Sequence, residues 1–236
     1  MIELTLNGAR VLFSTRQGGA SEGPYESLNL GILTDDAPDR VSENRRRLAE
    51  QASLDPHAVA MGWQVHGADV LDWDGPPADG GYARPGAELP RVDGHATTVP
   101  GVGLLVLVAD CLPVALAARK RIAMLHCGWR GLAAGIVERA LDGFAEPPAA
   151  AIGPGIGPCC YEVGDEVRAA FAGLDAVSDG RTLDLRAIAR AKLRAGGVSQ
   201  IEDVELCTSC RADLFFSHRR DGGVTGRQAG LVWRDA

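Results

Sequence analysis

The pattern of apolar and polar positions predicts short strands and amphipathic helices. Two strand-like stretches, 2–6 and 11–14, flank the dipeptide Asn7-Gly8, which favours a tight hairpin turn. The segment 38–52 begins with a proline, has acidic residues early, and spaces its apolar residues along one helical face. The chain is therefore expected to open with a β-hairpin followed by an amphipathic helix.

The middle of the chain is almost continuously apolar. Runs over 102–109, 113–118 and 122–125 lack alternation, which is typical of central strands buried on both faces. The other elements that the pattern predicts are helices over 132–144, 163–171 and 183–193 and strands over 149–152, 204–206 and 230–233. The stretch 72–90 is rich in Gly, Pro, Ala and Asp without periodicity, which indicates a surface loop that could serve as a lid.

These elements predict a mixed α/β layout (α+β) in one domain, 1–236, with a central mixed β-sheet core flanked by helices. A chain of 236 residues with 46% hydrophobic content can bury a sizeable core. The net charge of −7, without a Lys/Arg tract, disfavours nucleic acid and anionic membranes as partners. The chain start lacks a signal-peptide pattern, and no run approaches the roughly 20 apolar residues of a membrane span, so a cytoplasmic protein is expected.

Six cysteines are too few for a disulfide scaffold in a chain of this length, so each is read as a buried thiol, a ligand or a nucleophile. Cys207 and Cys210 have the spacing of a zinc-knuckle half-site, and Cys159 and Cys160 could supply a second pair. The second pair is adjacent, which is unusual for such a site. Buried or cleft-lining thiols are therefore favoured over a structural four-thiolate centre.

A histidine, a cysteine and a second histidine stand at the ends of strand-like runs: His66, Cys111 and His126. Zinc binds imidazole and thiolate tetrahedrally, and three protein ligands leave a fourth position for water or substrate, which implies catalysis. Each residue alone also has a structural interpretation, as a strand cap or a small packed side chain. Asp110 could orient a ligand, act as a general base or cap the turn.

Two other groups bear on the chemistry. Cys127 directly follows a candidate ligand, and neighbours on a strand point to opposite faces, which argues against a Cys-His dyad there. His218 lies in a basic turn that is either solvated or a cationic wall for an anionic substrate group. His57 and His95 have no comparable context.

Glycine-rich loops over 14–31 and 152–164 could bring backbone amides close to phosphate, but neither has a Walker or dinucleotide fingerprint. Arginine offers a planar fork for phosphate or carboxylate, although most arginines are surface charges. The arginines considered for this role are Arg16, Arg45, Arg130 and Arg219.

Several motifs in order resemble the YfiH-like family, long labelled polyphenol oxidoreductases or laccase-domain proteins and now regarded as purine nucleoside phosphorylases. The matching blocks are TRQGGASEGPY from Thr15, SLNLG from Ser27, QVHG from Gln64, ADCLPV from Ala109, HCGWRG from His126, GPGIGPCCYEVG from Gly153, FFSHRRDG from Phe215 and TGR from Thr225. The likeness covers nearly the whole chain. Departures are Cys127, where the family often has Ala, and the block 93–97.

The resemblance implies zinc on the same three residues, a fold like the cytotoxic-necrotizing-factor cysteine hydrolases, and a monomer or weak homodimer. It also implies phosphorolysis of adenosine, inosine and S-methyl-5'-thioadenosine with orthophosphate, together with adenosine deaminase activity. Among substrate-binding candidates, Arg45, Arg130 and Arg16 are expected at phosphate in that order, and Asn44 joins them. Asp110 is a further catalytic candidate.

Three other functions stay open at this point. A copper polyphenol oxidoreductase would bind Cu2+ with the same three residues, and Met124 would lie on the same strand face as His126. A multicopper enzyme, however, needs more imidazoles than the five in this chain. A Cys-His hydrolase that edits peptidoglycan precursors would use Cys111 as nucleophile. A non-catalytic zinc-stabilised binding protein would close the fourth position, with Cys127 or His95 as ligand.

Overall fold

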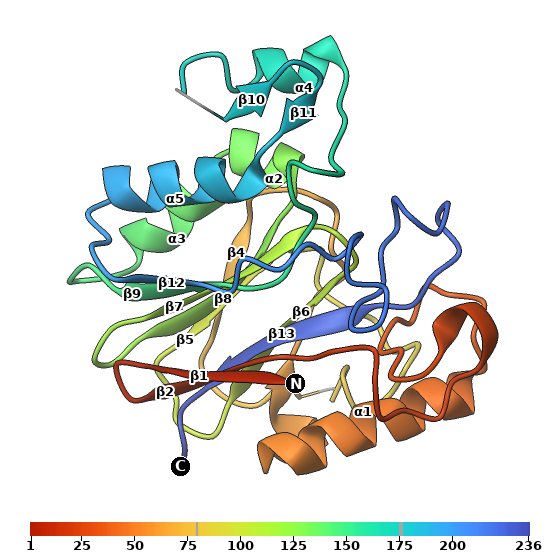
Figure 1. Ribbon diagram of the computed structural model, residues 1–236. Coiled ribbons are helices and arrows are strands. Elements are labelled where there is room, and N and C mark those ends of the chain that lie inside the picture. The colour runs from red at the N-terminus through yellow and green to blue at the C-terminus, as the bar shows by residue number, and fades with distance from the viewer. Residues whose placement is uncertain (79, 175–176) are drawn as a thin grey trace.

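Two β-sheets pack face to face at the centre of the protein, and helices cover both outer faces (Figure 1). The computed structural model describes residues 1–78, 80–174 and 177–236. The first sheet has the order β1 (Ile2–Leu6), β2 (Ala9–Phe13), β13 (Gln228–Trp233), β6 (Gly103–Val108) and β3 (Val59–Ala60). The second has the order β12 (Ile201–Asp203), β9 (Ala149–Ile152), β7 (Leu112–Ala117), β8 (Ile122–Cys127), β5 (Gly94–Thr97) and β4 (Val70–Trp73). Both sheets contain parallel and antiparallel pairs, so the fold is mixed α+β as predicted.

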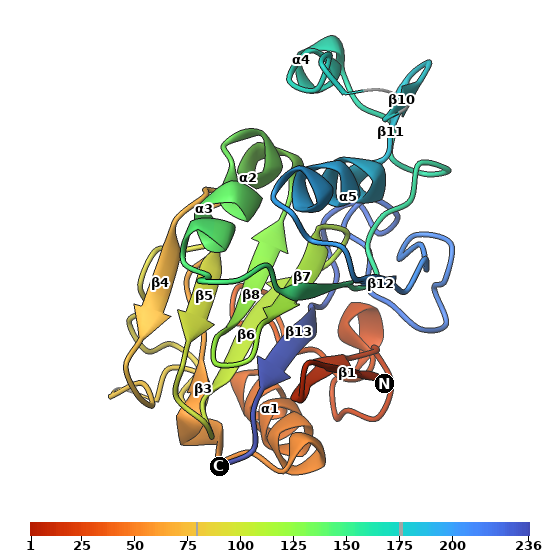
Figure 2. The ribbon, with the colours of Figure 1, turned by 90° about the vertical axis from the view of Figure 1, so that its left-hand side faces the viewer.

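The helices divide between the two outer faces (Figure 2). The outer face of the first sheet is covered by α1 (Pro38–Ala52). The outer face of the second is covered by α2 (Trp129–Ala133), α3 (Ile136–Asp142) and α5 (Leu185–Ala195). Beyond α5 lie α4 (Asp165–Ala169) and the pairing of β10 (Ser178–Asp179) with β11 (Thr182–Leu183), and single 3-10 turns occur at η1 (Gly23–Tyr25) and η2 (Pro56–Ala58).

The continuous apolar runs are explained by the layered packing. In β6, Leu104, Val106 and Val108 face the second sheet, whereas Leu105 and Leu107 face the α1 side. A strand covered on both faces requires apolar residues at both alternations. The sheet core predicted from the sequence thus consists of two sheets, with β6 in one and β7 and β8 in the other.

Three predicted elements are confirmed closely. β1 and β2 form the opening hairpin, with Asn7 and Gly8 at positive φ of 44° and 76° in the turn. The long helix α1 and the strand β9 have the predicted bounds. The helices predicted over 163–171 and 183–193 correspond to α4 and α5, with shifted ends.

The prediction of one helix over 132–144 is wrong, because two helices occupy this region. α2 ends at Ala133, and α3 begins after Gly135, which has φ of 87° and therefore interrupts the helical hydrogen bonding. The strand predicted over 204–206 is also wrong. β12 ends before it, and Glu205 has a left-handed φ of 48° that does not fit a strand.

The predicted loop over 72–90 differs from the structure at two points. It begins inside β4, and its Tyr82 is buried against the α1 side of the first sheet. Residue 79 of this stretch lies outside the described residues, and movement of the loop as a lid stays a prediction. The sequence pattern did not predict the buried strand β5, because its residues do not form an apolar run.

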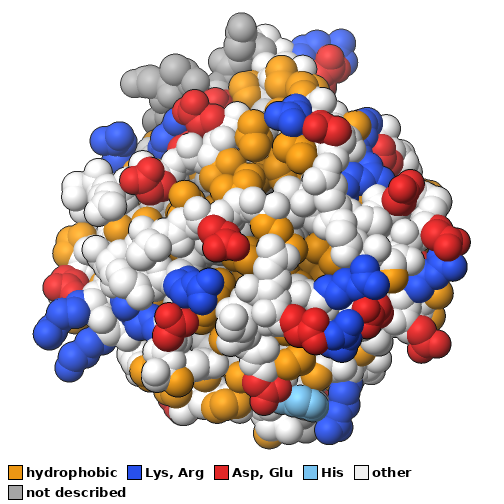
Figure 3. Space-filling view, turned by 60° about the horizontal axis from the view of Figure 1, so that its bottom comes forward, with side chains coloured by type: hydrophobic (Ala, Val, Ile, Leu, Met, Phe, Trp, Pro, Cys, Tyr) orange, Lys and Arg blue, Asp and Glu red, His pale blue; other side chains and the backbone are white. Residues whose placement is uncertain are grey.

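Charged side chains of both signs are mixed on the surface. On the face in Figure 3, basic and acidic side chains alternate over short distances without a large patch of one sign. Among the described residues, no helix combines the length and the apolar character needed to cross a membrane.

Candidate active site

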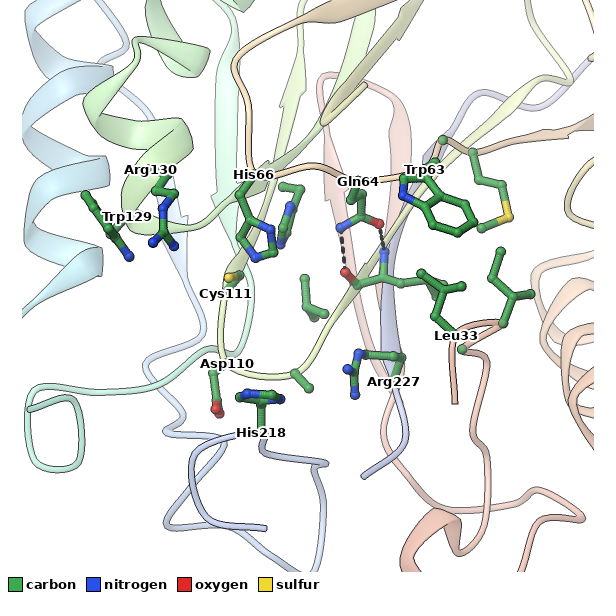
Figure 4. A pocket seen from close by; sticks show the side chains of 18 of the residues that line it. Leu33, Trp63, Gln64, His66, Asp110, Cys111, Trp129, Arg130, His218 and Arg227 are labelled. Carbon is green, nitrogen blue, oxygen red and sulfur yellow. Dashed lines mark hydrogen bonds between the residues drawn. The ribbon is translucent and has the colours of Figure 1, made fainter. Parts of the chain in front are cut away.

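Three segments that are distant in sequence bring His66, Cys111 and His126 together. His66 lies in the loop after β3, Cys111 in the turn between β6 and β7, and His126 in β8. One ligand atom from each lies within 4.8 Å of the others, and the two imidazole rings meet edge to face. Figure 4 shows His66 and Cys111 directed toward one another at the cavity wall.

Two residues at this site have backbone conformations that L-amino acids rarely adopt. His66 has φ of 60°, and Asp110, next to Cys111, has φ of 102°. Such conformations cost on the order of 1–3 kcal/mol each and persist where surrounding contacts hold them. Here they turn the chain sharply at the ends of the apolar runs, so that the ligand side chains project into the cavity.

Asp93 positions two of the three candidate ligands. Its fully buried carboxylate accepts backbone N–H groups from Val65, His66 and Gly67 at 3.0, 2.9 and 2.8 Å. It also lies 2.7 Å from Nδ1 of His126. An ionised carboxylate only accepts hydrogen bonds, so Nδ1 carries the proton and Nε2 of His126 is the nitrogen available to a metal.

The charges of the site favour a thiolate at Cys111. Burial raises the pKa of this thiol, but the charge and hydrogen bonding of His126 and His66 outweigh burial and lower the pKa to about 6. Burial lowers the pKa of His126, but Cys111 and Asp93 together raise it to about 9. A thiolate and two imidazoles form a donor set that fits Zn2+ and that Cu2+ also accepts.

Residues that could have completed this donor set point elsewhere. Cys127 packs in the core between the second sheet and its helices, so it forms no dyad with the preceding histidine. His95 is fully buried and accepts a hydrogen bond from Trp73 Nε1 at 3.1 Å. Met124 lies in the core between the two sheets. Within the described part of the chain, none of these three side chains lines the cavity, so none of them is placed to act as a fourth ligand.

The three ligand residues lie at the wall of a cavity of about 470 Å³. This volume falls in the range of small-molecule sites, roughly 300–1,000 Å³. Apolar and aromatic residues of the lining include Leu33, Met61, Trp63, Trp129 and Tyr161. Its basic residues are Arg130, His218, Arg219 and Arg227. The cavity therefore offers flat apolar surface for a ring system and positive charge for an anion.

Asp110 lines the cavity but is anchored away from the three ligands. Its Oδ1 accepts a hydrogen bond from Thr208 Oγ1 at 2.7 Å, and its Oδ2 accepts one from the backbone N–H of Arg219 at 2.7 Å. These bonds tie the turn before β7 to the loops after β12. Asp93, rather than Asp110, is the carboxylate that orients a candidate ligand.

The predicted substrate residues separate into two groups. Arg130 lines the cavity, stacked over the Trp129 ring at 4.4 Å. Arg45 lies outside it, fully buried, and donates to the carbonyl oxygens of Leu30 at 3.1 and 3.0 Å and of Tyr82 at 2.9 Å. Burial lowers the pKa of Arg45 to about 10. Its donors hold backbone rather than face the cavity.

Asn44 and Arg16 also have structural contacts outside the cavity. The buried amide of Asn44 donates to Ser21 and to two backbone carbonyl oxygens, and it accepts from the backbone N–H of Ala20. Arg16 donates to the carbonyl oxygens of Glu26 and Ala212 and lies over a phenylalanine ring. These contacts hold the glycine-rich loop over 14–31 against α1 and the C-terminal segment.

Sequence reasoning missed several lining residues and the orienting carboxylate. Trp63 and Trp129 lie within three residues of His66 and His126 in the chain, so their place near the candidate ligands could have been predicted. Arg227 comes from the end of the chain, just before β13. Asp93 gives no spacing signal toward His126, because antiparallel pairing of β5 with β8 brings them together.

Comparison with known proteins gives consistent likenesses. Residues 10–235 match the family model described as multi-copper polyphenol oxidoreductase laccase. The chain is 41% identical to "Purine nucleoside phosphorylase YfiH" of Escherichia coli (strain K12), over 96% of this chain and 94% of that protein. The crystal structure of YlmD from Geobacillus stearothermophilus is 37% identical with a TM-score of 0.89, over 97% and 93% of the two chains. The Bacillus licheniformis hypothetical protein YfiH is 34% identical, with the same TM-score and coverage.

Proposed function

Because the chain belongs to the family of YfiH and the laccase-domain proteins, we propose that it is a zinc-dependent purine nucleoside phosphorylase. The observation that carries this proposal is the convergence of His66, Cys111 and His126 at the wall of a cavity that also holds aromatic rings and arginines. Relatives named as purine nucleoside phosphorylases support the same function. The proposed substrates are adenosine, inosine and S-methyl-5'-thioadenosine, each with orthophosphate.

In this reaction the bond between the purine nitrogen and C1' breaks, and a bond from a phosphate oxygen to C1' forms. The products are the free base and ribose 1-phosphate or its methylthio derivative. The site must therefore hold a planar base, place phosphate next to C1', and donate a hydrogen bond to the departing base.

The base is proposed to lie against Trp63. This indole is 40% exposed and lines the cavity together with Met61 and Leu33; Figure 4 shows it at one end of the group of lining side chains. The neighbouring Gln64 is held by two hydrogen bonds of 2.8 Å to the backbone of Leu107, which attaches the loop to β6. The anchored Gln64 lies between Trp63 and His66 in the chain, so its hydrogen bonds help to position both residues.

Arg130 is the arginine that we favour for binding phosphate. Its guanidinium is exposed, stacked on Trp129, and makes no hydrogen bond to another of the described residues. Arg219 and Arg227 line the same cavity, but each already donates to backbone carbonyl oxygens. A free planar fork can bind a phosphate in bidentate fashion without losing an existing partner.

Zinc held by His66, Cys111 and His126 would supply a Lewis acid at the reacting centre. Tyr161 is the proposed hydrogen-bond donor to the departing base, which takes up its proton from solvent. Burial and then the negative charge of Cys111 raise the pKa of Tyr161 to about 12, so its phenol stays protonated at neutral pH. A protonated phenol in the cavity wall can donate a hydrogen bond to a base nitrogen as negative charge develops there.

The same centre is proposed to deaminate adenosine, with water replacing the 6-amino group and ammonia leaving. Zinc bound at the same three residues would supply the Lewis acid for this reaction as well. The two activities are separable by assay, because inosine forms without phosphate whereas adenine requires it. Deamination therefore gives an internal control for an intact metal site.

The test is chromatography of adenosine incubated with purified, metal-quantified protein, with and without orthophosphate. We expect phosphate-dependent adenine and phosphate-independent inosine, and loss of both with zinc in His66→Ala, Cys111→Ala and His126→Ala. Trp63→Ala should raise the KM for nucleoside while zinc is retained. A metal-free Cys111→Ala protein with full activity would contradict the proposal.

A second candidate function has one observation in its favour. The imidazole of His126 interacts with the thiol of Cys111 on one side and with the carboxylate of Asp93 on the other. This is the arrangement of a Cys-His hydrolase. Its substrate would be a peptide bond of a cell-wall precursor. Chelation separates the two functions, because removing zinc should release the thiolate and raise hydrolase activity, whereas it should abolish phosphorolysis.

A further inference from the structure

Four cysteines outside the candidate active site form a compact cluster. The thiol sulfurs of Cys159, Cys160, Cys207 and Cys210 all lie within 4.8 Å of one another. The Sγ of Cys210 is 3.5 Å from that of Cys159 and 3.4 Å from that of Cys160. All four are free thiols. Cys159 and Cys210 are exposed, so solvent ions can reach the cluster.

Backbone contacts position the sulfurs from two loops. One loop follows β9 and the other follows β12, and they meet at a parallel bridge between Gly155 and Cys207. The backbone N–H of Gly157 donates to the sulfur of Cys207 at 3.2 Å. Cys159 and Cys160 lie in a turn rather than a strand, so adjacency does not force their side chains to opposite sides.

We propose that these four cysteines bind a second Zn2+ ion, as a structural site separate from the one at His66. With Zn–S bonds near 2.3 Å, the sulfurs of a tetrahedral site are separated by about 3.8 Å. The separations of 3.4 and 3.5 Å, with all four sulfurs within 4.8 Å of one another, therefore place four soft donors close to that geometry. Structural zinc sites are typically closed by four protein ligands, as here, whereas the catalytic candidate offers three.

An arginine holds the backbone of the turn that carries Cys207 and Cys210. The guanidinium of Arg220 donates to the carbonyl oxygens of Thr208 and Ser209 at 2.9 and 3.4 Å, inside the Cys-x-x-Cys turn. Arg220 is also ion-paired with Asp221, so its contribution is to fix the backbone of this turn.

The proposed ion would fasten the wall of the catalytic cavity. Thr208, between two of the cysteines, donates to Asp110, which lines the cavity next to Cys111. Tyr161, which follows Cys160, lines the cavity itself. Zinc at the cluster would therefore hold both of these residues in place by fixing the two loops that carry them.

The test counts metal in the whole protein, purified in reductant without chelators. We expect two zinc ions per wild-type chain, one in Cys207→Ser/Cys210→Ser, and one in His66→Ala/His126→Ala. Cys127→Ala is the matched control, because it removes a buried thiol outside both clusters and should retain two ions.

Cobalt substitution of the wild-type protein keeps the test valid if a variant fails to fold. A four-thiolate site gives intense sulfur-to-cobalt charge-transfer absorption, so this signal in the wild-type protein should be well above that of the single thiolate at Cys111. One zinc per wild-type chain, lost with the histidine pair, would overturn the proposal. Disulfides linking the two loops in the freshly purified protein, detected by alkylation and mass mapping, would overturn it as well.

Discussion

The carboxylate of Asp93 lies 2.7 Å from Nδ1 of His126 at a position closed to solvent, and it accepts three backbone N–H groups from the loop that carries His66. One side chain thus sets the tautomer of one candidate ligand and the backbone position of another. Asp93 is therefore a positioning residue for the candidate metal site.

Asp93→Asn should weaken zinc binding, because the amide replaces an ionised acceptor by a neutral group. Loss of such an outer partner typically costs about 10–100-fold in metal affinity or activity. The measurements are a zinc-competition titration and kcat/KM for adenosine phosphorolysis. Asp69→Asn is the control, since Asp69 is exposed and pairs with Arg139 on the surface. Equal zinc affinity in wild type and Asp93→Asn would show that the carboxylate does not support the ligand.

Arg130→Ala should raise the KM for phosphate by about 10–100-fold, the size expected for losing charge-assisted hydrogen bonds of roughly 1.5–3 kcal/mol. Zinc content should stay unchanged, because Arg130 lies outside the ligand set. Steady-state kinetics with phosphate as the varied substrate provide the measurement. Arg139→Ala removes an exposed arginine from the adjacent helix α3 and should leave this KM unaltered. A similar KM in both variants would move phosphate binding to Arg219 or Arg227.

Arg45→Ala should destabilise the fold by about 2–5 kcal/mol. The substitution leaves the buried carbonyl oxygens of Leu30 and Tyr82 without their donor, and each such loss costs on the order of 1–3 kcal/mol. Urea denaturation measures the change in the free energy of unfolding. The fraction that remains folded should keep the wild-type KM for phosphate. A raised KM without lost stability would instead place Arg45 at the substrate.

The sequence could suggest that His66, Cys111 and His126 lie together as candidate metal ligands, because each stands at the end of an apolar run. Strand ends are where rigid elements present side chains to a cleft. The partner of His126 was not predictable in this way, since only the register of β5 against β8 brings Asp93 to it. Arg45 was expected at phosphate because a guanidinium offers a planar fork for an anion. Its burial on α1 and its backbone partners become visible only in the packed structure.

Gly135 shows why the apolar pattern over 132–144 predicted one helix where two exist. Its φ of 87° breaks the helix, although the apolar spacing continues past it. Gly135→Ala should therefore destabilise the protein by roughly 1–2 kcal/mol, the cost of a left-handed conformation for an L-residue. The control is Gly75→Ala, at a position without positive φ and with open space for a methyl group, which should be neutral or slightly stabilising. Urea denaturation compares the two, and equal free energies of unfolding would contradict this explanation.

His95 should make the folded protein lose stability in mild acid. Burial lowers its pKa to about 4, and its Nδ1 accepts a hydrogen bond from Trp73, so the folded state holds the neutral imidazole. The unfolded chain has an ordinary histidine pKa near 6.5. Between about pH 6.5 and 4 the unfolded state therefore binds a proton that the folded state does not, and stability falls as the pH falls.

The shift of roughly 2.5 pKa units corresponds to a loss of about 3 kcal/mol across this range, at about 1.36 kcal/mol per unit. Other groups titrate in the same range, so the test compares wild type with His95→Gln, which retains a hydrogen-bond acceptor for Trp73 but does not ionise. The free energy of unfolding, measured by urea denaturation from pH 7 to 4.5, should fall more steeply in wild type. Parallel curves would mean that His95 has the same proton affinity in the folded and unfolded states, which its burial without a partner for Nε2 argues against.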